Sequence, residues 1–77
     1  MDHIAKIINE WDPVGLFPYA PVDEYHSEIA EIRRLLSISK TPEELANGIY
    51  AIFCGSFGKN IFDKSKEECL SIALKLI

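Results

Sequence analysis

Apolar side chains recur at helical spacing from the very start of the chain. They fall at i, i+3, i+4 and i+7, which gathers them on one face of a helix. The residues concerned are Ile4, Ile7, Ile8 and Trp11. Pro13 cannot continue a helix and also restricts the residue before it. The pattern therefore predicts a first helix from Asp2 to about Glu10.

A second apolar stripe follows Pro21 and predicts a helix from about Asp23 to Leu36. Its members are Tyr25, Ile29, Ile32 and Leu36. They recur at i, i+4, i+7 and i+11, the spacing of a helix that buries one face.

The third helix has the clearest start signal. Thr41 suits the N-cap, Pro42 the first helical position and Glu44 the third, which together make a capping box. The predicted core face is Leu45, Ile49, Ile52 and Phe53. Gly48 on the same stripe predicts close approach by another element. The helix is expected to end near Gly55 or Gly58.

The fourth helix is predicted from about Lys64 or Lys66 to the end of the chain. Asp63 and Ser65 compete as N-cap, and Ser65 with Glu68 reads as a second capping box. Leu70, Ala73, Leu74 and Ile77 supply its apolar face. No apolar–polar alternation occurs along the chain, so no sheet is expected.

Residues 12–22 contain three prolines and one glycine, which favour a loop over regular structure. This loop is nevertheless apolar, and we expect it to pack on the helices as a fixed strap. Asp12 can cap a turn there by accepting backbone N–H bonds, while Gly15 supplies a positive φ. The expected fold is all-α: a single domain of residues 1–77, a compact bundle of four short helices with an apolar proline-rich strap between helices one and two.

Charge is unevenly distributed along the 77 residues. The first 31 residues hold seven acidic side chains and one lysine, whereas the remainder holds seven basic and five acidic residues. A net charge of -4 argues against a nucleic-acid ligand, which requires a basic stripe. The sequence shows neither a signal peptide nor a run of apolar residues long enough to span a membrane. We therefore expect a cytoplasmic protein.

The sequence offers little for catalysis or for binding a metal or cofactor. A carboxylate-bridged metal site in a helical bundle needs Glu-x-x-His motifs, and none occurs. No Ser-His-Asp order, glycine-rich phosphate loop or Cys-x-x-Cys pair is present. We predict no enzyme, no metal and no cofactor. Cys54 and Cys69 are interpreted as two buried free thiols in preference to a disulfide.

The second predicted helix carries an acidic ridge of Glu24, Glu28 and Glu31 beside its core stripe. No lysine or arginine lies one turn after Glu24 or Glu28 to offset their repulsion. The ridge is either ordinary solvated surface or a field that attracts a basic partner. Phe17 and Tyr19, flanked by prolines, are candidate aromatic anchors beside it. The candidate partner-binding residues are Asp12, Phe17, Tyr19, Asp23, Glu24, Glu28 and Glu31.

Short motifs give the chain a resemblance to a known family. The Trp-Asp-Pro-Val-Gly run at 11–15 and the Pro-Val-Asp-Glu-Tyr segment at 21–25 resemble an uncharacterised family of small bacterial proteins. The Phe-Asp-Lys-Ser stretch at 62–65 and Cys69 fit the same family. That family is a domain of unknown function, so the resemblance implies a compact helical fold and no activity.

Some small acidic proteins of this general kind are similar to immunity proteins encoded beside bacterial toxins. The leading hypothesis is accordingly a non-catalytic protein-binding module, an immunity-type inhibitor that covers a basic surface of a toxin such as a nuclease. The alternative is a cytosolic accessory or regulatory protein that forms homo-oligomers. The sequence does not specify the oligomeric state.

Overall fold

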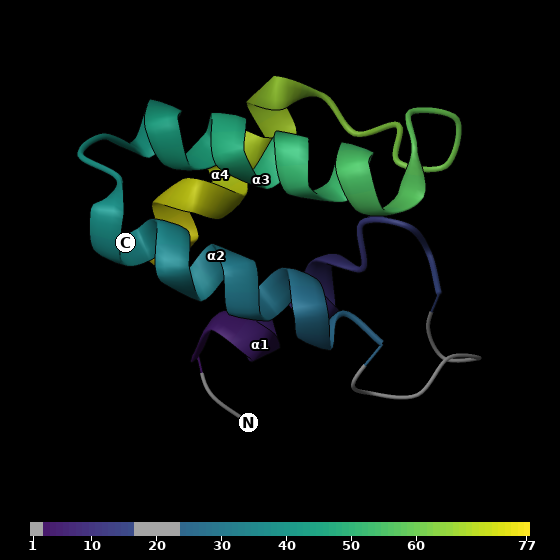
Figure 1. Cartoon of the computed structure of the whole chain (residues 1–77), viewed down its shortest axis with the longest axis horizontal. Coiled ribbons are helices and arrows are strands. Elements are labelled where there is room, and N and C mark those ends of the chain that lie inside the picture. Colours follow the sequence, from purple (N-terminus) through teal and green to yellow (C-terminus); the bar gives the residue numbers. More distant parts are fainter. Residues whose placement is uncertain (1–2, 17–23) are drawn as a thin grey trace.

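The computed structural model describes residues 3–16 and 24–77 and contains four helices in that part of the chain (Figure 1). These are α1 (His3–Trp11), α2 (His26–Ile38), α3 (Pro42–Phe57) and α4 (Lys66–Leu76). The described residues form no strand. The all-α bundle of four short helices is therefore confirmed.

Packing in the bundle is dominated by the pairs α3–α4 and α2–α3, while α1 lies against both α4 and α2. The C-terminal end of α4 lies near the end of α2 and the beginning of α3 (Figure 1). At the opposite end of the bundle, the start of α2 lies beside the end of α3. This antiparallel arrangement of α2 and α3 determines which side chains meet at each end.

Aromatic rings fill the centre of the core around Phe53. Its ring stacks on those of Phe57 and Phe62, with centroids 6.1 and 5.3 Å away. Trp11 and Tyr25 meet the same ring edge-on, at 5.8 and 5.9 Å. Edge-to-face and offset contacts of this kind add to the stabilisation that apolar burial provides. The lone tryptophan is half-buried against this core.

In both predicted capping boxes, the N-cap side chain accepts the expected hydrogen bond. The Thr41 hydroxyl accepts a hydrogen bond from the Glu44 backbone N–H at 3.1 Å, and Ser65 accepts one from Glu68 at 3.1 Å. Each bond satisfies an N–H that the helix itself leaves free. At the other end of α3, Gly58 takes a φ of +83° and donates its N–H to the Cys54 carbonyl. Gly58, and not Gly55, therefore ends the helix.

The predicted close approach at Gly48 is present between α2 and α3. A Cβ added at Gly48 would collide with Cδ1 of Leu35. A side chain at position 48 would therefore require the end of the Leu35 side chain to move.

The predicted limits of α2 need correction. The helix begins at His26 instead of Asp23 and extends to Ile38, two residues past Leu36. Tyr25 is the N-cap residue and makes no side-chain capping bond there. Its ring is fully buried and its hydroxyl is engaged with the preceding segment. Because this one aromatic side chain packs in the core, the helix starts after Glu24, which was expected to lie inside it.

Candidate functional site

The seven predicted partner-binding residues divide into two groups. Phe17, Tyr19 and Asp23 lie outside the described residues, so their predicted role stays a prediction. Asp12, Glu24, Glu28 and Glu31 lie within them. The structure gives these four carboxylates very different surroundings.

Asp12 lies in the corner that follows α1. Its φ is +47°, and its carbonyl accepts a hydrogen bond from the Gly15 N–H at 3.0 Å to close a turn around Pro13. Its Oδ1 atom accepts from the Leu16 N–H at 2.9 Å, and Gly15 has a φ of +70°. The predicted turn-capping role of Asp12 is therefore confirmed.

Tyr25 connects this corner to the start of α2. Its hydroxyl donates to Oδ1 of Asp12 at 2.7 Å and accepts from the Val14 N–H at 3.2 Å. Burial and the neighbouring Asp12 carboxylate raise the pKa of Tyr25 well above its usual range. The periodicity of the sequence indicated only the buried ring, because the hydroxyl's partners lie 11 and 13 residues away.

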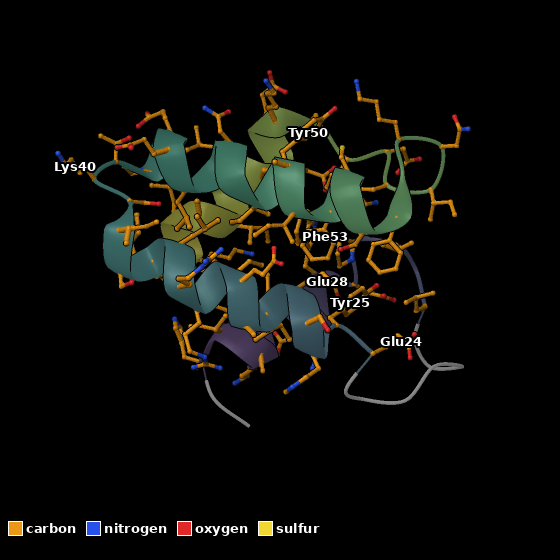
Figure 2. The ribbon with its side chains drawn as sticks, in the orientation of Figure 1. Glu24, Tyr25, Glu28, Lys40, Tyr50 and Phe53 are labelled. Atoms are coloured by element: carbon orange, nitrogen blue, oxygen red, sulfur yellow. The ribbon has the colours of Figure 1, made fainter. Side chains whose placement is uncertain are left out.

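The three glutamates of the predicted ridge do not form one exposed line. Glu24 precedes α2 and is exposed, as is Glu31 one turn after Glu28. Glu28 itself is only 8% exposed. Figure 2 shows Glu28 on the side of α2 that faces α3, whereas Glu24 lies beyond the beginning of the helix. The three glutamates therefore form no exposed ridge, since one carboxylate is buried and two are exposed.

The acidic corner is defined as Glu24, Glu28 and Glu31, in and just before the first half of α2, and among the described residues of this segment only Arg34 is a basic residue one turn from any of them. One turn to either side of Glu28, the helix presents Glu24, Tyr25, Glu31 and Ile32. The facing helix α3 carries no charged residue between Leu45 and Phe57. α3 ends at this corner where α2 begins, so the negative end of the α3 dipole and the positive end of the α2 dipole lie together and offset each other.

Trp11 and Tyr50 mark two further polar contacts on other faces. The Trp11 indole N–H donates to Oε2 of Glu68 at 3.1 Å, which ties α1 to the first turn of α4. The Lys66 ammonium lies 5.5 Å above the Tyr50 ring. A hydrogen bond with the Cys54 thiol raises the pKa of Tyr50. Cys54 and Cys69 are free thiols, as the sequence predicted, and Cys54 is only half-buried.

A groove lies at the other end of α2 from the acidic corner. It has a volume of about 460 Å³ and runs between the end of α2, the start of α3 and the end of α4. Leu36, Leu45 and Leu76 give it apolar walls, and Lys40 is the one titratable side chain among its lining residues. A single lysine supplies no acid–base pair, so the groove has the character of a contact surface.

The described residues contain neither a helix suited to cross a membrane nor a cluster of metal ligands. No helix in the two described stretches combines the length and apolar character that crossing a bilayer requires. Within 3–16 and 24–77, no three His, Cys, Asp or Glu side chains converge as ligands for a metal ion.

Comparison with known proteins identifies the family. No curated protein and no solved structure matches the chain. A family described as a domain of unknown function, DUF1871, matches residues 3–77. The match covers all four helices and the corner that joins Asp12 to Tyr25. The chain therefore belongs to the DUF1871 family.

Proposed function

We propose that this protein is a non-catalytic protein-binding module that receives a basic surface of its partner at the acidic corner. The observation that supports it is the grouping of Glu24, Glu28 and Glu31. No lysine or arginine lies one turn from Glu24 or Glu28 in the described residues, and none occurs in residues 46–56 of α3. Like charges left without offset cost stability, and a protein partner with opposite charge converts that cost into binding energy.

The concrete form that we propose is an immunity-type inhibitor, acting in the cytoplasm and covering the basic surface of a toxin such as a nuclease. Exposed glutamates speed the diffusional encounter with a basic surface, and aromatic side chains that become buried slow its release. Glu24 and Glu31 suit the first role because both are exposed. Phe17 and Tyr19 remain the predicted anchors for the second.

Charge reversal at the two exposed glutamates tests the proposal. Glu24→Lys combined with Glu31→Lys leaves the buried Glu28 in place and should not disturb the core. We expect the variant to lose a basic protein that co-purifies with the wild type from the source cells. We also expect it to lose protection of those cells from the corresponding toxin.

The matched control reverses two exposed glutamates elsewhere, Glu43→Lys with Glu67→Lys, which makes the same change in net charge. Capture and protection should persist in this control. Equal loss in both variants would show that net charge alone is responsible. Undiminished capture by the Glu24 and Glu31 variant would refute the acidic corner as the binding surface.

A second candidate is a regulatory or accessory protein that acts as a homo-oligomer. Its support is the exposure of large aliphatic side chains near the end of α2 and on α4, with Ile38 64% and Ile77 72% exposed. Apolar side chains on a surface commonly mark contacts between proteins. Sedimentation over a wide concentration range distinguishes the two, since only this candidate predicts concentration-dependent association of the isolated chain.

A further inference from the structure

We propose that Glu28 is the anchor of the acidic corner and that it takes an arginine side chain of the protein partner. This inference rests on the proposed function and adds to it the residue at the centre of the contact and the side chain that it accepts. Glu28 is buried to more than nine-tenths, in contrast to Glu24 and Glu31 beside it. Its surroundings supply the argument.

The Glu28 carboxylate has no partner in the described part of the protein. No hydrogen bond or ion pair joins it to another residue of 3–16 or 24–77. The residue as a whole is 8% exposed, and neither carboxylate oxygen is completely closed off from solvent. Burying a charge without a partner is costly, and a positive group that binds at the opening recovers that cost.

The position of Glu28 favours a positive ligand over a negative one. It lies in the first turn of α2, between two further glutamates one turn away. The end of α3 and the beginning of α2 both lie at this corner, so their dipoles offset each other and the glutamate side chains determine the sign of the field. Neither the described positions one turn from Glu28 on α2 nor the charge-free stretch of α3 carries a lysine or arginine.

The aromatic wall of the corner favours arginine over lysine. Tyr25 lies one turn before Glu28, and the half-buried Phe57 ring is 6.1 Å from the Tyr25 ring. Figure 2 shows Glu28, Tyr25 and Phe53 on the same side of α2, toward α3. A guanidinium group can pair with a carboxylate through two hydrogen bonds while its flat face rests on an aromatic ring, and Phe57 is the half-buried ring of this group, since the Tyr25 and Phe53 rings are fully buried. An ammonium group forms neither contact as well.

A peptide titration followed by NMR tests this inference. The probe is an end-capped octapeptide of alternating glycine and arginine, with its lysine counterpart for comparison. We expect the arginine peptide to shift the signals of Glu28 and Phe57 in the wild type and to bind more tightly than the lysine peptide. Glu28→Gln keeps the shape of the side chain and should weaken arginine binding about tenfold or more.

Two further variants make the outcome decisive. Glu67→Gln, at an exposed site on α4, should bind the arginine peptide as the wild type does. Glu28→Gln should unfold at the same denaturant concentration as the wild type or a higher one, because it removes a buried charge without a partner. A marked fall in that concentration would show that the carboxylate serves the fold, and would overturn the inference.

The inference and the proposed function can fail separately. If Glu28→Gln binds the arginine peptide unchanged, or if the peptide shifts neither Glu28 nor Phe57 in the wild type, Glu28 is not the anchor. The proposed function would still stand if charge reversal at Glu24 and Glu31 abolishes capture of the basic partner. If that reversal is also without effect, both proposals fall.

Discussion

Three polar side chains near the beginning of α2 differ in the hydrogen bonds that they form. Asp12 accepts from a backbone N–H and from the Tyr25 hydroxyl, and Tyr25 accepts in turn from Val14. Glu28 is buried and no described residue pairs with it. The first two therefore serve the fold, whereas Glu28 is the residue to which we assign the proposed contact with a partner.

Replacing Tyr25 by phenylalanine tests the structural half of this distinction. The variant keeps the ring in the core but removes the hydroxyl that Asp12 and the Val14 N–H share. We expect a loss of about 1–3 kcal/mol in the free energy of unfolding, measured by urea denaturation. Tyr50→Phe, at a half-buried site, should cost clearly less. Equal losses in the two variants would show that the Asp12–Tyr25 hydrogen bond contributes no additional stability to the fold.

Cys69 predicts a change of stability at alkaline pH. Burial, followed by the Glu68 carboxylate and then Cys54, raises the pKa of its thiol from about 9 to about 11. The folded protein then keeps a proton that the unfolded chain loses near its ordinary pKa. Stability should therefore fall as the pH rises from about 9 to about 11, by at most ~1.4 kcal/mol per pH unit from this group.

Cys69→Ala removes this contribution and should unfold less steeply with pH over the same window. Below about pH 8 its stability should run parallel to that of the wild type, at a lower level because a buried side chain has been shortened. Chemical denaturation at a series of pH values provides the comparison. Identical slopes between pH 9 and 11 would exclude Cys69 as the titrating group.

At the scale of elements, the contact of Leu35 with Gly48 determines how closely α2 and α3 pack. Gly48→Ala would gain up to ~1 kcal/mol of helix propensity, but its Cβ displaces the end of the Leu35 side chain. We expect these effects nearly to cancel in the wild type. In a Leu35→Ala background the conflict disappears, and Gly48→Ala should stabilise by about 0.5–1 kcal/mol.

Gly55 is the matched control for this cycle, because it lies in the same helix and a Cβ there would meet nothing within 4 Å. Gly55→Ala should stabilise by a similar amount whether or not Leu35 is present. Thermal and urea unfolding of the wild type and the five variants would measure both cycles. The same effect of Gly48→Ala in the two backgrounds would contradict the proposed close contact.

Local signals in the sequence predicted the elements well. The caps at Thr41 and Ser65 and the end of α3 at Gly58 depend on residues within one or two turns. The beginning of α2 depends on Tyr25, whose hydroxyl partners lie 11 and 13 residues earlier, so periodicity placed it too soon. Predictions from neighbouring residues succeeded where the contacts that determine the structure also lie between neighbours in the sequence.

The surroundings of Glu28 were predictable in part. At 100° per residue, Glu28 lies about 60° from Tyr25 around the helix, whereas Glu31 lies about 120° away. Glu28 is therefore the ridge member nearest the core stripe, and its burial follows once a neighbouring helix covers that side. The sequence did not show that α3 would face it with a stretch without charges, because this depends on how the two helices align.

At the scale of the whole molecule, the two ends of α2 present opposite kinds of surface. The beginning of α2 carries the acidic corner, and its end contributes to the apolar groove with Lys40 at its edge. With 13 residues in the helix, the two ends are about 20 Å apart. A partner seated at one end should thus leave the other largely uncovered.

Hydrogen exchange of the protein with and without its co-purified basic partner tests the central claim most directly. We predict that the partner slows exchange at residues 24–31 and at the end of α3, near Phe57, and leaves residues 36–45 unchanged. Slower exchange confined to 36–45 and the last residues of α4, with none at the beginning of α2, would contradict the account and place the interface at the apolar groove.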